Sequence, residues 1–379
     1  MVVPSILFLE VLTEIKGGQR MLLDLMPAFS GWERHVVVPG LGPLSDEVER
    51  AGGLVHVMPM AQYGLLTKGA LDVLAFAREL GSLSRRVAKL SRQLGADVLF
   101  ANSSRAFAWG TLAAQQARLP MIWQAHNLLV DAKTLHLTRT LARLPAVQRI
   151  IGYSPSATRQ FHTGKGATVP LAVDLTTYRP SETNRSQLRA AMGISPETFV
   201  LAHVGDLIPL KGQALLVEAA GQLPQVRFLV IGAPRQDQPS SVGYANDLYA
   251  GASSNVGFLG ERHDVPEILA AVDALVITST QETGPRVLAE AMATALPVIS
   301  TKVGMAPDLL RPGETGYLIE QNDAAGLIAC LQALAADRAS AKMMGLNARR
   351  LAEDELSIER YRIRVRSLVE EALAIASER

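Results

Sequence analysis

Two glutamates on one short segment are the residues of this sequence best placed to bind a sugar or a ribose. Glu282 precedes a Thr-Gly-Pro turn, and Glu290 follows it with seven residues between them. Pro285 favours the first turn of a helix, so Glu290 is expected about 8 Å along that helix, at ~1.5 Å per residue. Carboxylates accept paired hydrogen bonds from neighbouring hydroxyls, as in dinucleotide sites. Taken alone, the spacing is common, and a capping glutamate with a surface glutamate explains it better.

A lysine at an earlier predicted strand end can supply a phosphate contact beside these carboxylates. The segment VGDLIPLKG (204–212) ends a strand and leads into a helix. Gly205 permits a tight turn and the close approach of a ligand to the backbone. Lys211 lies near the start of the helix, where free N–H groups and the helix dipole already favour an anion. Without other evidence, a solvated lysine after an ordinary turn is the simpler interpretation.

In the first half of the chain, three further groups of residues end predicted strands. Gly17 and Gly18 occupy a strand-to-helix turn that suits the close approach of a phosphate or an acceptor. His126 ends the strand MIWQAH; a lone histidine is more often structural, but its place at a strand end favours a functional role. The candidate acceptor contacts are Asn102, Ser103 and Ser104.

Alternating strands and helices are expected to position these residues in two domains. In the first half, predicted helices at 20–29, 71–94 and 105–118 separate most of the strands, which are 5–12, 35–40, 54–60, 97–103, 121–126 and 149–154. In the second half, predicted helices at 212–222, 264–271, 286–294 and 323–336 alternate with strands at 198–206, 226–232, 256–260, 274–279, 297–301 and 317–320. This βαβ pattern predicts two doubly wound, Rossmann-like α/β domains that face one another across a cleft.

The domain boundary is expected where the helical period is lost. The segment 169–186 contains two prolines and is predicted to be the linker. Residues 1–175 form the predicted N-terminal acceptor-binding domain, and residues 176–360 form the predicted nucleotide-sugar-binding domain. The tail is expected to be helical, with its last part, 360–379, packing back onto the first domain. Ligands of such sheets bind at the carboxyl ends of the strands, where the residues above lie.

Composition restricts the classes of protein to consider. The chain has 379 residues, 48% of them apolar and 19% charged, which suits two well-packed domains. The net charge of +1 does not require nucleic acid as a partner. The single cysteine, Cys330, excludes a disulfide within the chain and fits a reducing compartment. The N-terminus reads as a strand, and no apolar run reaches the ~20 residues of a membrane span. A cytoplasmic protein is therefore predicted.

Charge is distributed unevenly along the chain. Residues 1–175 carry 18 basic and 12 acidic residues, whereas the remainder carries 19 and 24. Chance and solvation explain this as well as an anionic partner does, such as the inner face of a membrane. A basic stretch beyond the histidine is open to the same two interpretations, a solvated helix face or contact with a phospholipid or polyprenyl-phosphate acceptor; its members are Lys133, Arg139, Arg143 and Arg149.

The order of several segments resembles that of a known family. NVGFLGERHDVPEILAAVDALVITS (255–279) precedes the two glutamates, and EAMATALPVISTKVG (290–304) and PGETGYLI (312–319) follow them. The chain resembles the retaining glycosyltransferases of the GT-B fold, of the family 4 type, also called glycosyl transferases group 1. The resemblance is specific over residues 200–320 and weaker before them.

The resemblance implies a role for each matching residue. The expected catalytic residues are Lys211 at the donor diphosphate, Glu282 at the donor sugar and His126 near the reacting carbon. Glu290 is expected to hold the ribose. The remaining nucleotide-sugar contacts are expected from Gly17, Gly18, Gly205, Gly232, Leu259, Thr283, Gly284, Pro285, Arg286 and Val287.

The sequence also departs from the family pattern. Asp206 stands where the family has an arginine that binds the diphosphate. Its charge would repel a phosphate by ~1 kcal/mol at about 4 Å, even in the dielectric of water. Either Asp206 turns away and Arg286 supplies the missing cation, or donor binding is weakened. Thr283 and Ala295 replace two family glycines, and the linker motif survives only as LAVD (171–174).

The resemblance implies transfer of a sugar, with retention, from a nucleotide-diphosphate donor to a hydroxyl acceptor, including a lipid-linked one, in glycan, glycolipid or polysaccharide synthesis. A UDP-sugar is the first choice of donor and a GDP-sugar the second. The departing phosphate would take the acceptor's proton while the protein stabilises the diphosphate, so no cofactor or metal is expected. Asp206 supports one alternative, a non-catalytic GT-B binding or scaffold protein. A sugar-nucleotide epimerase, the other, would need acid and base groups that the sequence does not place.

Overall fold

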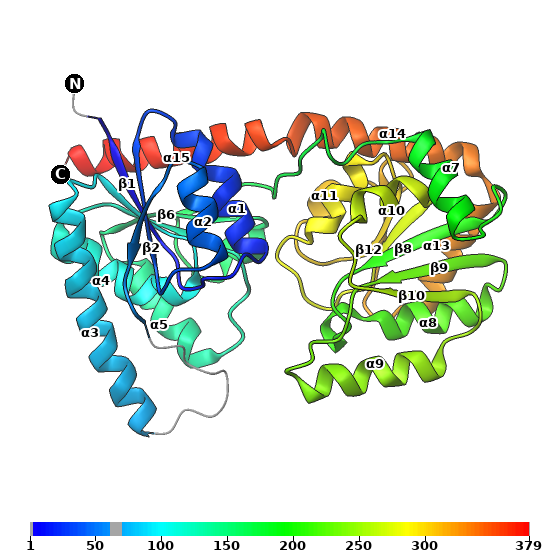
Figure 1. Ribbon diagram of the computed structural model, residues 1–379, viewed down its shortest axis with the longest axis horizontal. Coiled ribbons are helices and arrows are strands. Elements are labelled where there is room, and N and C mark those ends of the chain that lie inside the picture. Colours follow the sequence, from blue (N-terminus) through cyan, green and yellow to red (C-terminus); the bar gives the residue numbers. More distant parts are fainter. Residues whose placement is uncertain (1–2, 61–69, 379) are drawn as a thin grey trace. The chain divides into compact units, whose positions relative to one another are not determined.

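The computed structural model describes residues 3–60 and 70–378, without the side chains of residues 70–77. The chain divides into two compact units (Figure 1). Unit 1 comprises Met1–Val169 together with Glu359–Arg379, and unit 2 comprises Pro170–Ile358. The chain therefore leaves unit 1 at 169, where the sequence analysis expected 175, and returns to it at 359.

Unit 1 contains a parallel seven-stranded sheet with the strand order β3-β2-β1-β4-β5-β6-β7. Its strands are β1 (Ser5–Leu9), β2 (Glu33–Val38), β3 (Leu54–Val57), β4 (Val98–Ala101), β5 (Met121–Ala125), β6 (Val147–Gly152) and β7 (Gly166–Thr168). Its helices are α1 (Gly17–Leu25), the 3₁₀ turn η1 (Met26–Phe29), α2 (Pro43–Arg50), α3 (Ala70–Gln93), the 3₁₀ turn η2 (Ser104–Ala106), α4 (Phe107–Ala117), α5 (Ala132–Ala142), α6 (Pro155–Arg159) and α15 (Ile358–Ser377).

The central strands of unit 1 are buried along their whole length, because helices cover the sheet. Apolar side chains of α3, α4 and α5 pack with alternate residues of β1, β4 and β5, and Trp123 stacks on Phe107 with ring centroids 4.2 Å apart. The C-terminal helix α15 is fixed to α1 and η1. Arg362 Nε donates to the Asp24 carbonyl at 2.6 Å, and Arg366 Nη1 donates to the Ala28 carbonyl at 2.8 Å.

Unit 2 contains a parallel six-stranded sheet with the order β10-β9-β8-β11-β12-β13. Its strands are β8 (Phe199–Val204), β9 (Val226–Ile231), β10 (Val256–Gly260), β11 (Ala274–Ile277), β12 (Val298–Thr301) and β13 (Gly316–Ile319). Its helices are α7 (Glu182–Ala191), the 3₁₀ turn η3 (Pro209–Lys211), α8 (Gln213–Gln222), α9 (Pro239–Gly251), α10 (Val265–Ala271), α11 (Arg286–Ala293), α12 (Ala306–Leu309), α13 (Ala324–Ala336) and α14 (Arg338–Glu355).

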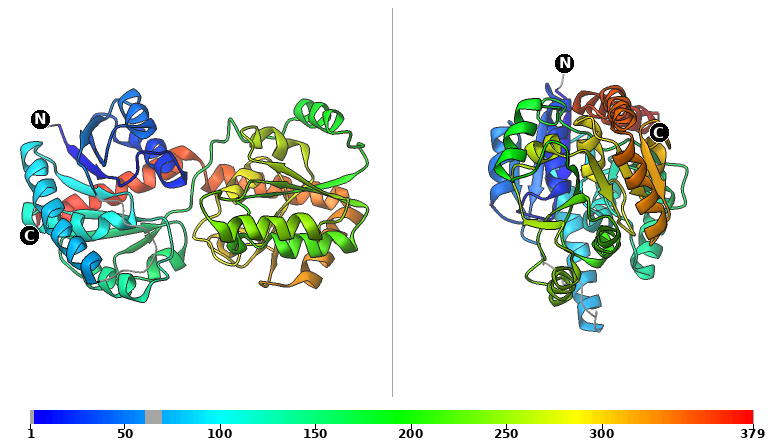
Figure 2. Two further views of the ribbon diagram at one scale, coloured as in Figure 1. Left: turned by 60° about the horizontal axis from the view of Figure 1, so that its bottom comes forward. Right: turned by 90° about the vertical axis from the view of Figure 1, so that its right-hand side faces the viewer.

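The helices of unit 2 lie on both faces of its sheet, with α8 and α9 on one side and α10 and α11 on the other (Figures 1 and 2). Apolar residues of α8, α9 and α13 form one core with β8, β9 and β11. The strand order reverses between β8 and β11 in this sheet and between β1 and β4 in unit 1. Such a reversal leaves a crevice outside the carboxyl ends of the two strands, where doubly wound sheets bind ligands.

The α/β class and the two doubly wound sheets confirm the prediction of the fold, but several elements differ from it. Helices α2, α5, α6, α9 and α12 and strand β7 were not among the predicted elements. The predicted linker was too long, because α7 begins at Glu182 inside it; the Ser181 hydroxyl caps this helix by accepting from the Asn184 N–H at 3.2 Å. The helix predicted at 20–29 starts earlier, at Gly17, and changes to a 3₁₀ turn at Met26, next to Pro27, which cannot donate a backbone hydrogen bond.

Candidate functional site

In unit 2, the loops after β8 and β11 lie against each other at the reversal of strand order. These two strands are neighbours, with Ala274 paired to Leu201. Gly212 has a φ of 67°, and an added Cβ would lie 2.2 Å from the Thr278 carbonyl oxygen, so only glycine fits there. The Thr278 hydroxyl donates to the Lys211 carbonyl at 2.9 Å. The fold therefore fixes the segment that carries Lys211 against the loop that leads to Glu282.

Lys211 and Glu282 form an ion pair at this place. Lys211 Nζ lies 2.6 Å from Glu282 Oε1, and the Ser279 hydroxyl donates to the same oxygen at 3.0 Å. The two side chains keep 27% and 16% of their surface exposed, so a ligand can reach both. A Cβ on Gly205 would lie 3.3 Å from Lys211 Cδ and Cε, and the missing side chain therefore leaves room for the lysine stem. The site therefore offers two groups in direct contact with each other: the Lys211 ammonium, which can bind an anionic group, and the Glu282 carboxylate, which can accept hydrogen bonds from hydroxyls.

Glu290 lies on α11 and is almost fully buried. Arg286 Nε lies 3.0 Å from Glu290 Oε1, one helical turn away, and Tyr178 forms a hydrogen bond with the same carboxylate. Burial raises the pKa of Glu290, whereas Arg286 and Tyr178 act in the opposite direction. Burial, and then Glu290, raise the pKa of the Tyr178 phenol. The arginine and the phenol thus hold Glu290 in one orientation. Tyr178 was missed because it lies in the predicted linker.

Asp206 makes a contact that the sequence analysis did not anticipate. Arg235 Nε donates to Asp206 Oδ2 at 2.8 Å, and both side chains are about half exposed. The charge of Asp206 is therefore balanced by Arg235, which lies in the loop after β9, three residues beyond Gly232. Arg286 instead contacts Glu290, and its predicted compensation for Asp206 stays a prediction. The position of Arg235 after a strand end was the available signal.

The other nucleotide contacts predicted in unit 2 lie at or near the carboxyl ends of the strands of this sheet. Gly232 has a φ of 136°, and a Cβ there would lie 2.1 Å from the Gly205 carbonyl oxygen. The Gly232 N–H donates to the Gly260 carbonyl at 2.8 Å, and Leu259 lies where the pairing of β10 shifts register. Thr283 is buried, and a Cβ on Gly304 would lie 2.8 Å from its carbonyl. The predicted backbone segment continues through Gly284 and Pro285, the residue that precedes α11, to Val287 within the helix.

In unit 1, four polar residues each follow directly after one of four neighbouring strands. Asn102, which follows β4, donates from Nδ2 to Glu10 Oε2 at 2.7 Å, and Glu10 follows β1. His126 Nε2 lies 3.1 Å from Asn102 Oδ1, and the Tyr153 hydroxyl lies 2.7 Å from His126 Nδ1. Burial lowers the pKa of His126 to about 4. Glu10 and Tyr153 were not predicted as site residues, because the predicted strands 5–12 and 149–154 ran past them, whereas β1 ends at Leu9 and β6 at Gly152.

The glycine turn of unit 1 contacts this chain of residues. Gly17 is the first residue of α1, and Gly18 follows it. Asn102 Nδ2 also donates to the Gly18 carbonyl at 3.1 Å, and a Cβ on Gly18 would lie 3.3 Å from two atoms of the His126 ring. The structure therefore brings Gly18, Asn102 and His126 together. Ser103 directly precedes the 3₁₀ turn η2, and Ser104 is its first residue.

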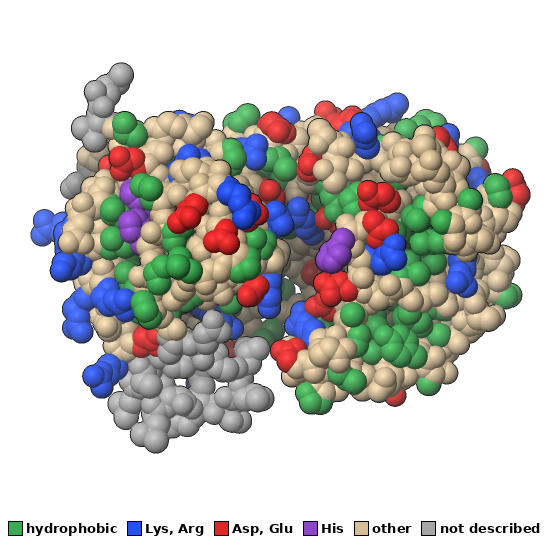
Figure 3. Space-filling model, in the orientation of Figure 1, with side chains coloured by type: hydrophobic (Ala, Val, Ile, Leu, Met, Phe, Trp, Pro, Cys, Tyr) green, Lys and Arg blue, Asp and Glu red, His purple; other side chains and the backbone are tan. Residues whose placement is uncertain are grey.

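Two members of the predicted basic stretch form contacts within unit 1. Arg139 Nε donates to the Gln160 carbonyl at 2.7 Å, and Arg149 Nη2 lies 3.2 Å from Glu371 Oε2. Lys133 and Arg143 are exposed. Basic side chains also gather along the edge of unit 1 formed by α3 (Figure 3). Lys133 and Arg143 therefore remain the members of the stretch that an anionic partner can reach most easily.

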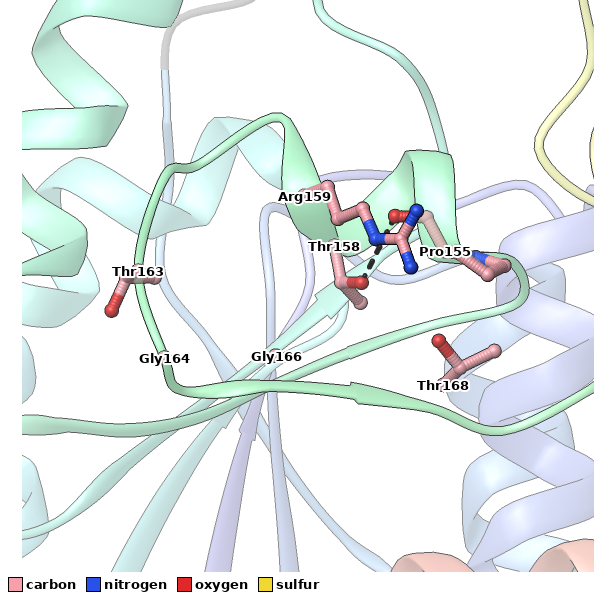
Figure 4. A pocket seen from close by; sticks show the side chains of 7 residues that line it. All are labelled: Pro155, Thr158, Arg159, Thr163, Gly164, Gly166 and Thr168. Carbon is pink, nitrogen blue, oxygen red and sulfur yellow. Dashed lines mark hydrogen bonds between the residues drawn. The ribbon is translucent and has the colours of Figure 1, made fainter.

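A separate pocket of about 270 Å³ lies between α6 and β7 (Figure 4). Its lining is Pro155, Thr158, Arg159, Thr163, Gly164, Gly166 and Thr168. The Thr158 hydroxyl is turned back to the Pro155 carbonyl at 3.2 Å. The pocket contains none of the residues that the sequence analysis selected. Across residues 3–60 and 70–378, no helix is long and apolar enough to cross a membrane, and no three His, Cys, Asp or Glu side chains are grouped as metal ligands.

Comparisons with known proteins match both halves of the chain. The family described as Glycosyl transferases group 1 matches residues 184–351, and Glycosyltransferase Family 4 matches residues 15–177. A D-inositol 3-phosphate glycosyltransferase of Mycobacterium sp. (strain KMS) is 37% identical over 157 residues, which are 40% of this chain and 35% of that protein. The corresponding protein of Nocardia farcinica is 29% identical over 269 residues, 63% of this chain and 58% of that protein. The matches thus span about a third to three fifths of these relatives.

Solved structures share the fold across almost the whole chain. Anabaena HepE in complex with UDP superposes with a TM-score of 0.83 and 24% identity, covering 97% of this chain and 100% of that one. The fold resemblance therefore extends through both units.

Proposed function

Since the chain belongs to the family 4 glycosyltransferases of group 1, with the GT-B fold, we propose that it transfers a sugar from a nucleotide diphosphate to a hydroxyl acceptor with retention of configuration. A UDP-sugar is the favoured donor and a GDP-sugar the second choice. HepE binds UDP in its solved complex, which supports this order.

The observation that carries the proposal is the Lys211–Glu282 pair at the strand reversal of unit 2. A diphosphate and a sugar present an anion and hydroxyls next to each other, and the pair offers a cation and a carboxylate 2.6 Å apart. Donor binding would break this ion pair, so that Lys211 contacts the diphosphate and Glu282 accepts hydrogen bonds from the sugar hydroxyls. Glu290, on the neighbouring helix, would take the ribose hydroxyls.

In the transfer step, negative charge grows on the departing diphosphate as the sugar leaves. A preorganised ammonium lowers the activation barrier, because it stabilises the charge of the transition state more than that of the bound donor. The phosphate oxygen that leaves the sugar would take the proton of the acceptor hydroxyl. Lys211 is therefore the residue on which the rate should depend most strongly.

The acceptor is assigned to unit 1. Inositol phosphates are the substrates named for the sequence relatives, and exposed Lys133 and Arg143 suit a phosphorylated or lipid-linked acceptor. A lipid-linked acceptor would bring unit 1 to the inner face of a membrane as a peripheral contact.

The test is calorimetry of the full chain with UDP, GDP and ADP, followed by donor hydrolysis assays. We expect UDP to bind most tightly, and Lys211→Met to weaken binding while Lys302→Met leaves it unchanged. Lys302 is a matched control because it is an exposed lysine of the same unit that pairs with Glu320. No binding of any nucleotide would contradict the enzymatic proposal. Nucleotide binding without hydrolysis or transfer would favour a binding protein.

A further inference from the structure

Glu10, Asn102, His126 and Tyr153 form a hydrogen-bonded row across four neighbouring strands. Each is the first residue after its strand, and the strands β1, β4, β5 and β6 are consecutive in the sheet. Glu10, Asn102 and Tyr153 are at most 3% exposed. Buried polar groups are retained only when their hydrogen bonds are satisfied, so the direction of each bond in such a row is constrained.

The orientation of the Asn102 amide is fixed by the Gly18 carbonyl, which can only accept a hydrogen bond. Asn102 Nδ2 lies 3.1 Å from that oxygen and 2.7 Å from Glu10 Oε2, so its two N–H groups have acceptors on both sides. The amide oxygen must then face the histidine. The second Glu10 oxygen accepts from the Val11 N–H at 2.7 Å, which holds the carboxylate in place.

The orientation of the amide determines the tautomer of the histidine. Asn102 Oδ1 lies 3.1 Å from His126 Nε2, and because an amide oxygen cannot donate, Nε2 must carry a proton. In the neutral ring, Nδ1 then has a lone pair, and the Tyr153 hydroxyl at 2.7 Å donates to it. This arrangement satisfies the bonds from Glu10 through Asn102 and His126 to Tyr153 together.

We propose that Glu10, Asn102 and Tyr153 are positioning residues that hold His126 as a neutral imidazole protonated on Nε2, with no basic ring nitrogen left for the acceptor hydroxyl. The tautomer is a property of unit 1 alone. The consequence for catalysis rests on the proposed function: His126 orients the glycine turn and the reactants and takes no proton in the transfer. A charged ring would require the Tyr153 hydroxyl to turn and the charge to be buried, which agrees with the lowered pKa of His126.

The direct test is ¹⁵N NMR of the histidine rings in the full chain, with the His126 signals assigned by their loss in His126→Gln. We expect one protonated Nε2 and one unprotonated Nδ1 from pH 8 down to pH 5. A proton on Nδ1 instead, or an imidazolium at pH 7, would overturn the proposal.

Comparison of two variants tests whether Asn102 controls the protonation of His126 or has only a structural role. Asn102→Asp keeps the shape but faces Nε2 with a carboxylate, so the midpoint of the His126 titration should rise above pH 6. Asn127→Asp is the matched control, because it adds the same charge at an exposed residue beside His126 and should raise the midpoint far less. Equal midpoints in the two variants would contradict the proposed role of Asn102.

Tyr153→Phe removes only the donor to Nδ1 and covers the case in which Asn102→Asp fails to fold. The Nδ1 signal should move to the position of a nitrogen without a hydrogen bond, while Nε2 stays protonated. An unchanged Nδ1 signal would contradict the assignment of Tyr153. If sugar transfer is detected, its pH profile should show no ionisation of His126 between pH 5 and 8 in the parent protein. If no transfer is detected, the NMR result still decides the tautomer, so the two proposals fail separately.

Discussion

The two sheets reverse their strand order in the same way, but they place different chemistry at the reversal. In unit 2, the reversal carries two ion pairs: Lys211–Glu282, in which both side chains are partly exposed, and Arg286–Glu290, in which the carboxylate is almost fully buried. In unit 1, it carries the buried row from Glu10 to Tyr153, in which the histidine is neutral. One topology therefore carries charged pairs in unit 2, which under the proposed function would exchange their partners for the donor, and a hydrogen-bonded row in unit 1, which would keep its partners. The predictions below test that division.

The largest effect is expected at the charged reversal. Lys211→Met should lower kcat/KM for sugar transfer by about 100- to 1,000-fold, the cost of removing one preorganised charge stabiliser from a transition state. Steady-state kinetics measure it. Asn102→Asp should lower nucleotide affinity far less than Lys211→Met, because Asn102 holds the Gly18 carbonyl and His126 and supplies no cation to the diphosphate. A comparable loss of nucleotide affinity in both variants would contradict the division of roles.

The second effect concerns pH and the neutral histidine of unit 1. The folded pKa of His126 is about 4, below the unfolded value near 6.5, so the unfolded chain binds more protons under pH 6.5. Stability should therefore fall as pH decreases from about 6.5 to about 4, by roughly 2 kcal/mol for this partly exposed ring. All three tryptophans, Trp32, Trp109 and Trp123, belong to unit 1, so fluorescence-detected urea unfolding reports on this unit.

The matched variants for the pH experiment are His126→Gln and His136→Gln. The first should flatten the loss of stability, whereas the second changes an exposed histidine of α5 and should leave the slope unchanged. Identical slopes in the parent protein and His126→Gln would show that other groups cause the acid sensitivity of unit 1.

A third, smaller effect is expected at the buried carboxylate of unit 2. Glu290→Gln should weaken UDP binding by about tenfold, equal to ~1.4 kcal/mol, because an amide presents only one acceptor to the two ribose hydroxyls. Calorimetry measures the affinity. Glu218→Gln, an exposed residue of α8, is the control and should change nothing. Unaltered affinity in Glu290→Gln would remove this residue from the proposed donor site.

The smallest effect tests the backbone beneath the charged reversal. Ala295, at a position where the family has glycine, has a φ of 60° just after α11. An alanine in this left-handed conformation costs ~1–2 kcal/mol, partly offset by the greater freedom of glycine in the unfolded chain. Ala295→Gly should therefore stabilise the protein by roughly 0.5–1 kcal/mol in urea unfolding. Ala329→Gly, at an exposed residue in the middle of α13, should destabilise it by about as much. If both variants changed the free energy of unfolding in the same direction, the explanation from the positive φ would be contradicted.

Much of the fold was predictable, because strands and helices differ in the period of their apolar residues. The residue types at the strand ends, including Lys211, Glu282 and His126, were also visible in the sequence. Their partners were not, because the partners depend on which strands become neighbours. Lys211 and Glu282 are 71 positions apart, and Glu10 and Asn102 are 92 apart. Arg235 and Tyr153 were missed for the same reason, since their contacts exist only after the crossovers have placed their loops.

The return of the chain from unit 2 to unit 1 has a consequence for synthesis on the ribosome. The last helix, α15, buries Tyr361, Val365 and Val369 in unit 1, and it carries the two arginines that bind the carbonyls of Asp24 and Ala28. Translation delivers this helix only after all of unit 2 has been made. The N-terminal unit, although synthesised first, is therefore completed last. A nascent chain that stops near residue 358 would present a finished unit 2 beside an unfinished unit 1, with apolar surface open to chaperones.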